Sequence, residues 1–161
     1  MTSQRFWHIG INTVDIERSI EFYRKVGFEL EDRGVVENDA LADAFMVPGG
    51  RKVEVAHLRI NGDRRDEALI DLIQWVDPPT QGRAEPASMI DPGLCRFSIL
   101  CDDLDERYET LSAAGVEFVK PPTTVMQADG KRGWKIVFAT DPDGTLFHFV
   151  QQIGDRDQHP T

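Results

Sequence analysis

The chain has 161 residues, with 28 acidic and 18 basic side chains and a formal net charge of −10. This length fits one domain that buries a core without disulfide or zinc staples. The negative charge disfavours nucleic acid and anionic lipid surfaces as partners, because it repels their phosphates. No apolar run approaches the roughly 18 residues of a spanning helix, and the opening MTSQRFWHIG lacks the apolar segment of a signal peptide. We therefore expect a cytoplasmic protein that does not bind membranes.

An internal repeat organises the chain. Residues 15–30 match residues 103–118 at an offset of 88, with Asp, aliphatic, Gly and Glu positions in register, and residues 68–74 match residues 145–151 at an offset of 77. Each copy is typical of a strand, a helix and three further strands. The sequence therefore predicts module one at 5–76, a linker at 77–93 with four prolines and two glycines, module two at 94–153, and a loose tail at 154–161.

In module one, a predicted strand at 6–14 leads into a helix for which Asp15 is a typical N-cap. Ile16, Ile20 and Tyr23 form one apolar stripe of that helix, and Gly27 marks its end. Three strands are predicted to follow, with a loop or short helix at 38–45 between the first two. Their ranges are 28–35, 52–60 and 68–76.

Module two repeats this order with a helix at 104–114 and a tight turn at the Asp-Pro-Asp-Gly of 141–144. Its four strands are predicted at 96–101, 116–120, 135–140 and 146–152. The segment 123–134 is interpreted either as a lid or as an ordinary solvated loop. Cys95 and Cys101 lie six residues apart in one extended segment, about 20 Å by strand rise, so they should remain unpaired thiols.

Strand alternation divides the predicted strands into two faces. One face is apolar and is expected to pack under the helices; it carries Trp7, Ile9, Ile11, Ile70, Leu72, Phe97, Ile99, Phe147 and Phe149. The other face carries four ionisable side chains: His8, Asp71, Arg96 and His148. The offsets make them two symmetry-equivalent pairs that we expect to converge. Because burial of an isolated charge costs several kcal/mol, each needs a partner, a metal or a ligand.

Other polar residues have simpler interpretations. His57 and Glu54 fall on opposite faces of the third strand, so at least one of them is expected at the surface. Gln74 and Gln151 are symmetry-related and are predicted to cap a sheet edge.

The strand His8-Ile9-Gly10-Ile11, the helix sequence DIERSIEFY at 15–23, Gly27-Phe28 and the turn at 141–144 together resemble the vicinal oxygen chelate superfamily. That superfamily includes glyoxalases, bleomycin-resistance proteins and extradiol dioxygenases, and the resemblance covers residues 5–153. It implies an α+β fold in which two βαβββ modules form a curved, cup-shaped mixed sheet with helices on the outer face. It implies no single function, because members include lyases, isomerases, epimerases, dioxygenases and metal-free drug-binding proteins.

The resemblance also implies a metal site. Glyoxalase-like members hold a divalent metal through residues on the first and last strand of each module, which here are His8, Asp71, Arg96 and His148. His8, Asp71 and His148 would bind Fe, Mn, Zn or Ni and leave positions open for a substrate with vicinal oxygens. Arg96 has no lone pair to donate, so it would instead bind an anionic group of the substrate. Trp134 is a candidate second substrate contact, or else a buried anchor. Family habit implies a homodimer.

Two hypotheses for function remain open. The first is a metal-dependent enzyme of the lyase, isomerase or dioxygenase type acting on a small molecule with vicinal oxygens, although no catalytic base is evident. The second is a metal-free small-molecule binding or resistance protein, in which Trp7, Trp75 and Trp134 stack on a cationic ligand. In that case Arg96 and Asp71 would pair with each other and the histidines would be satisfied by neighbours.

Overall fold

The computed structural model describes residues 6–60, 69–85, 89–90 and 92–154. The chain divides into two compact units, Met1–Arg83 and Ala84–Thr161, whose boundary falls within the range expected for the linker. Most of the expected tail, 155–161, lies outside the described residues. Within the part that is described, no helix is long and apolar enough to cross a membrane.

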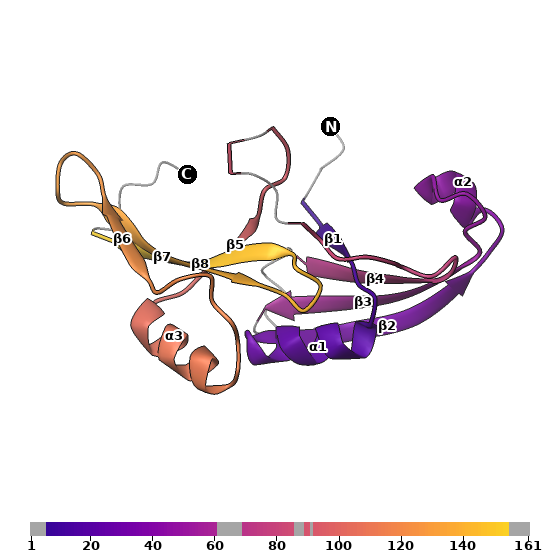
Figure 1. The fold of residues 1–161 in the computed structure, drawn as a ribbon, viewed down its shortest axis with the longest axis horizontal. Coiled ribbons are helices and arrows are strands. Elements are labelled where there is room, and N and C mark those ends of the chain that lie inside the picture. The colour runs from indigo at the N-terminus through magenta and orange to yellow at the C-terminus, as the bar shows by residue number, and fades with distance from the viewer. Residues whose placement is uncertain (1–5, 61–68, 86–88, 91, 155–161) are drawn as a thin grey trace, which may run out of the picture. The chain divides into compact units, whose positions relative to one another are not determined.

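The first unit is a four-stranded mixed sheet with one long helix and one short helix. Its strand order is β1-β4-β3-β2, with β1 parallel to β4 and the other neighbours antiparallel. Figure 1 shows α1 running along one face of this sheet. The elements are β1 (His8–Asn12), α1 (Ile16–Lys25), β2 (Phe28–Glu37), α2 (Leu41–Phe45), β3 (Lys52–Ile60) and β4 (Leu69–Asp77).

The second unit has the same connectivity, in the order β5-β8-β7-β6, with α3 against β7 and β8 (Figure 1). Its elements are β5 (Phe97–Leu100), α3 (Leu104–Ala113), β6 (Thr123–Met126), β7 (Gly133–Thr140) and β8 (Leu146–Ile153). The α+β class and the two βαβββ modules are thereby confirmed. In the described residues their strands form two separate four-stranded sheets.

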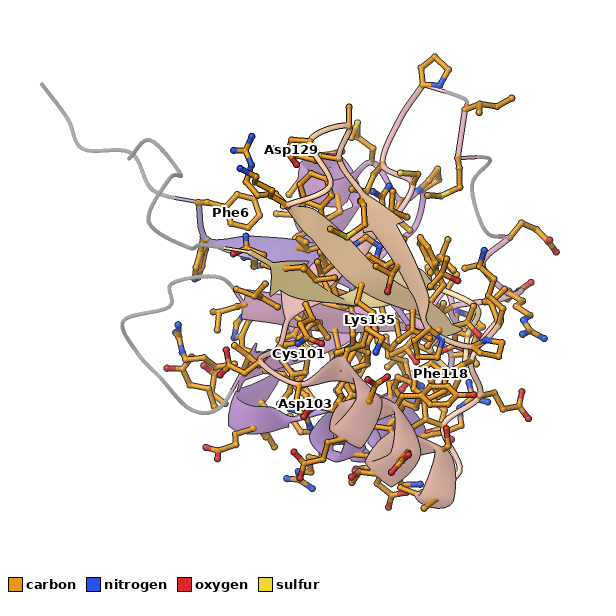
Figure 2. The ribbon with its side chains drawn as sticks, turned by 90° about the vertical axis from the view of Figure 1, so that its left-hand side faces the viewer. Phe6, Cys101, Asp103, Phe118, Asp129 and Lys135 are labelled. Carbon is orange, nitrogen blue, oxygen red and sulfur yellow. The ribbon has the colours of Figure 1, made fainter. Side chains whose placement is uncertain are left out.

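One predicted strand is wrong. Residues 116–120 contribute only an isolated bridge between Phe118 and Ala139, and the strand on the other side of β7 from β8 is β6. Pro121 and Pro122 lack backbone N–H groups, so a continuous ladder cannot pass through them and begins again at the β-branched residues that follow. The expected lid or loop is thus largely a hairpin, and Figure 2 shows Asp129 at its tip. Asp129 Oδ1 accepts hydrogen bonds there from the backbone N–H groups of Lys131 and Arg132.

Helix starts follow the predicted pattern. Asp15 Oδ1 accepts a hydrogen bond of 3.1 Å from the backbone N–H of Arg18. The equivalent Asp103, labelled in Figure 2 where α3 begins, accepts from the backbone N–H groups of Asp105 and Glu106 at 3.0 Å. Gly27 follows α1 with a φ of 101°, the left-handed conformation expected after a helix end.

The two symmetry-related glutamines cap helices, so their assignment to sheet edges is wrong. Gln74 on β4 accepts at Oε1 from the backbone N–H of Ile16 at 2.8 Å, and Gln151 on β8 accepts from that of Leu104 at 3.1 Å. Each last strand of a unit therefore binds the first turn of that unit's helix. This contact joins sheet and helix at the same place in both units.

We expect Gln74→Ala and Gln151→Ala each to lower the free energy of unfolding by about 1 kcal/mol, because each leaves a helix N–H without its acceptor. Urea denaturation measures the effect. Gln74→Glu and Gln151→Glu keep an acceptor oxygen and should retain most of the stability. Unchanged urea midpoints in both alanine variants would show that water replaces the glutamines without cost.

Candidate functional site

A buried carboxylate lies between two imidazoles in the first unit. Asp71 on β4 is directly across from His57 on β3, and its neighbour Leu72 points into the core. Asp71 Oδ1 is 3.6 Å from His57 Nε2, and Asp71 Oδ2 is 4.0 Å from His8 Nε2. Both distances exceed those of hydrogen bonds, so the three side chains face one another across a gap.

His57 is the member of this cluster that was not expected. Its Nδ1 lies 2.8 Å from Asp32 Oδ1 on β2, and only an Nδ1–H can bond to a carboxylate. Neutral His57 therefore turns the lone pair of Nε2 towards Asp71. Glu54 lies on the opposite face of β3, as alternation requires, and accepts a hydrogen bond of 2.7 Å from Arg33.

The polar atoms of the cluster are incompletely satisfied. The pKa of Asp71 is raised, chiefly because burial disfavours its charged form. The charges of His57 and His8 act in the opposite direction, and Asp32 adds a smaller rise. Asp71 Oδ1 and His8 Nδ1 are buried without a hydrogen-bond partner among the described residues. Unpaired buried polar atoms are costly, and in native proteins they commonly mark functional sites.

Trp7 lies beside this cluster rather than under the helix, so its predicted position is wrong. Its side chain is 61% exposed, and its ring centroid is 4.7 Å from that of His8 and 6.1 Å from that of His57. Residue 7 precedes β1, so the alternation of that strand does not determine its direction. Trp75, also considered for stacking on a ligand, is buried in a small apolar cluster with Leu41 and Val53.

In the second unit, both ring nitrogens of His148 are engaged. Arg96 Nε donates to His148 Nδ1 at 3.1 Å, and Ser98 Oγ lies 2.6 Å from His148 Nε2. A guanidinium only donates, so Nδ1 is the acceptor and the Nε2–H of the neutral ring donates to Ser98. Neutral His148 consequently has no free lone pair for another partner.

His148 is kept neutral by its surroundings. It is 5% exposed. Burial, followed by the charge of Arg96, lowers its pKa from 6.5 to about 4. The Phe138 ring meets the imidazole edge-on at 4.9 Å, and the Arg96 guanidinium lies 5.9 Å from the centre of the same ring. Arg96 also donates from Nη1 to Cys95 Sγ at 3.1 Å. Cys95 and Cys101 are both free thiols, as predicted.

Trp134 lies on β7 and is 37% exposed. Strand alternation places it on the same face as Phe138, which is directly across from His148. The predicted site residues thus form two pairs, His8 with Asp71 and Arg96 with His148. The role of Trp134 as a substrate contact stays a prediction.

The donor atoms at the four expected metal positions do not fit a divalent ion. Arg96 offers no lone pair, and its hydrogen bond together with that of Ser98 occupies both nitrogens of His148. Within the described part of either unit, no three His, Cys, Asp or Glu side chains are arranged to hold a metal. Of the four expected positions, only His8 and Asp71 keep the chemistry of metal ligands, and two ligands are fewer than the three or four of protein zinc sites.

Comparisons with known proteins agree on the fold. A family model described as the Glyoxalase/Bleomycin resistance protein/Dioxygenase superfamily matches residues 5–149. A glyoxalase family protein from Bacillus cereus is 22% identical, with 96% of this chain and 97% of that chain covered and a TM-score of 0.76. A glyoxalase/bleomycin resistance protein/dioxygenase domain from Frankia is 18% identical, with 96% and 100% covered and a TM-score of 0.63.

The trypanothione-dependent glyoxalase I of Leishmania major is 18% identical, with 92% of this chain and 87% of that chain covered and a TM-score of 0.59. At these identities the likeness to solved structures shows the fold alone. No curated protein matches the chain.

Proposed function

Because the chain belongs to the Glyoxalase/Bleomycin resistance protein/Dioxygenase superfamily, we propose that it binds a small organic molecule on the sheet faces opposite α1 and α3, without a four-ligand divalent metal centre. The observation that best supports this proposal is the hydrogen bond from Arg96 Nε to His148 Nδ1. It ties together two of the four positions at which glyoxalase-like members carry metal ligands. Family habit further supports a homodimer as part of the proposal.

Energetics also favour this proposal. Releasing Nδ1 of His148 to a metal would break its hydrogen bond from the Arg96 guanidinium, and a hydrogen bond to a charged group contributes about 1.5–3 kcal/mol. The guanidinium would then lie beside a divalent cation. Repulsion between two unit charges 4 Å apart is already about 4 kcal/mol at an effective dielectric constant near 20. A metal site at these positions must offset both terms.

A metal-dependent enzyme acting on vicinal oxygens is the second candidate, and one observation favours it. Asp71 Oδ1 is buried between two imidazoles without a hydrogen-bond partner, and His8 Nδ1 is also unpartnered. A cation near Asp71 would stabilise this carboxylate. If a divalent ion is bound, it would polarise a substrate oxygen as a Lewis acid, with His8 and Asp71 among its ligands.

Elemental analysis of protein purified without chelator or added metal tests the proposal. We expect well under one divalent ion per chain, and a melting temperature that neither EDTA nor added Zn²⁺, Mn²⁺, Ni²⁺ or Fe²⁺ changes. A ligand at 100 times its Kd adds about 2.7 kcal/mol of stability, so binding of a metal would be easily seen. About one ion per chain, lost in both His8→Ala and His148→Ala, would overturn the proposal in favour of the metal enzyme.

Arg96→His is the matched gain-of-function variant. It removes the cation, frees Nδ1 of His148 and supplies another imidazole at the expected ligand position. We expect this variant to retain Zn²⁺ or Ni²⁺ more tightly than the unmodified protein. Equal and negligible retention in both proteins would show that Arg96 is not what prevents metal binding.

A further inference from the structure

The second unit carries a half-buried cation without a carboxylate partner. Within the described residues of the second unit, no Asp or Glu forms an ion pair with Arg96, whose contacts there are with an imidazole, a thiol and a phenyl ring. Three other half-buried cations do have such partners: Lys52 with Glu37, Arg59 with Glu31, and Lys135 with Asp105. An unpaired charge is costly to bury, so a missing anion is a natural complement of Arg96.

The free hydrogen-bonding groups around Arg96 are donors. Arg96 Nε and Nη1 are engaged, but Nη2 has no partner among the described residues and is absent from their buried unpartnered atoms, so it is open to solvent. Ser98 is exposed, and since its Oγ accepts from His148, its own O–H remains available to donate. A guanidinium edge beside a hydroxyl matches the oxygens of a carboxylate.

The surface next to these donors is apolar. Trp134, Ile136 and Phe138 alternate onto the same face of β7, and Phe138 lies beneath the guanidinium with its centroid 5.9 Å from Cζ. Leu100, two residues after Ser98 on β5, is exposed on that face as well. Side chains of this kind bind the hydrocarbon part of a ligand, whereas an inorganic anion would leave their apolar surface exposed to water.

We propose that the second unit binds a small organic carboxylate with an apolar body, with the carboxylate on Arg96 and Ser98 and the body on Phe138, Ile136 and Trp134. This inference rests on the proposed function and names its ligand class. His148 is a positioning residue, because its Nδ1 orients the guanidinium and its Nε2–H orients the serine hydroxyl.

The test uses four probes on the full chain: phenylacetate, acetate, inorganic phosphate and the cation benzylamine. Isothermal titration calorimetry and ligand-observed NMR measure binding. We expect phenylacetate to bind more tightly than acetate or phosphate, and benzylamine not to bind. Arg96→Gln should weaken phenylacetate roughly 10- to 100-fold, as loss of a charge-assisted hydrogen bond does. The phenylacetate affinity of Arg96→Lys should lie between those of the unmodified protein and Arg96→Gln, because lysine keeps the charge but lacks the planar guanidinium.

Arg107→Gln is the matched control. The Arg107 guanidinium also lies 5.9 Å from a phenylalanine centroid, that of Phe149, but it belongs to α3 on the opposite face. Its loss should leave phenylacetate affinity unchanged. Ser98→Ala, an exposed change that the fold should tolerate, should weaken phenylacetate by severalfold and provides a second measure if Arg96→Gln does not fold.

Equal phenylacetate affinity in the unmodified protein and in Ser98→Ala and Arg96→Gln would overturn the inference, as would binding of benzylamine or phosphate only. Failure of the proposed function would be recognised from a different measurement, the metal content, which is determined on the same preparations. One ion per chain together with Arg96-dependent phenylacetate binding would overturn the metal-free proposal and leave the carboxylate site intact.

Discussion

Lowering the pH from 7 to 4 is expected to remove about 3 kcal/mol of folding stability through His148 alone. Its pKa is about 4 in the folded chain against an ordinary value of 6.5, because burial and then Arg96 oppose its charged form. Between those values the unfolded chain binds a proton that the folded chain does not. The contribution of neutral His148 to folding stability is therefore fully present above pH 6.5 and is lost as the pH falls towards 4.

Urea denaturation at several pH values between 7 and 4 measures this effect, with His148→Asn as the matched variant. Asparagine does not titrate, and its amide oxygen can accept from Arg96 Nε in place of Nδ1. Asp71 contributes with the opposite sign, because burial raises its pKa and its folded form gains stability as the pH falls. The difference between the two proteins isolates His148, since Asp71 is present in both.

Parallel pH profiles for the two proteins would contradict the arrangement described for the second unit. In that case His148 would be solvated or released from Arg96, and its nitrogens would be available to a metal. A direct NMR titration of the His148 imidazole gives the same information: a midpoint near 4 supports a ring buried beside Arg96, and a midpoint near 6.5 would contradict that burial. The stability profile thus also tests the basis of the metal-free proposal.

Period-two alternation and the internal repeat explain why the two pairs of site residues could be predicted. Alternation depends only on the parity of residues along a strand, so His8 and Asp71 could be assigned to one face without knowledge of the loops. The offsets then identified Arg96 and His148 as their equivalents. Helix caps were predictable for a similar reason, because Asp15 and its equivalent bond within three residues.

His57 could not be predicted in the same way, because its place depends on pairing between strands. Parity gives the face of β3, but only the register of β3 against β4 brings His57 opposite Asp71. The pairing recurs in the second unit, where Phe138 lies across from His148 as His57 lies across from Asp71 in the first. This equivalence depends on strand register, so the repeat alone did not contain it.

The hydrogen-bond partners of Arg96 also could not be predicted from the sequence. An ion pair with Asp71 was one alternative; within the second unit, the Arg96 guanidinium donates to His148 and Cys95. Both contacts follow from the torsions of a long flexible side chain, which strand periodicity does not determine. The same limit applies to Trp7, which lies just outside the first strand and packs on two imidazoles.

Replacing Phe147 by alanine is expected to lower the free energy of unfolding by about 3–5 kcal/mol, because the change leaves a cavity in the core of the second unit. Phe147 is 0% exposed, with ring centroids 5.3 Å from Phe97 and 5.7 Å from Phe149. Urea denaturation at pH 7 measures the loss. Phe6→Ala is the surface control, since Phe6 is 64% exposed (Figure 2), and should change stability by less than about 0.5 kcal/mol.

Phe147 and His148 are adjacent on β8 but point to opposite faces, so their effects should separate. Phe147→Ala, or the milder Phe147→Leu, should lower stability by a similar amount at every pH, because burial of His148 beside Arg96 is unchanged. His148→Asn should instead change the slope with pH. If Phe147→Leu also abolished the slope, packing under α3 would control the Arg96–His148 contact. The candidate site would then depend on the core rather than on its own face of the sheet.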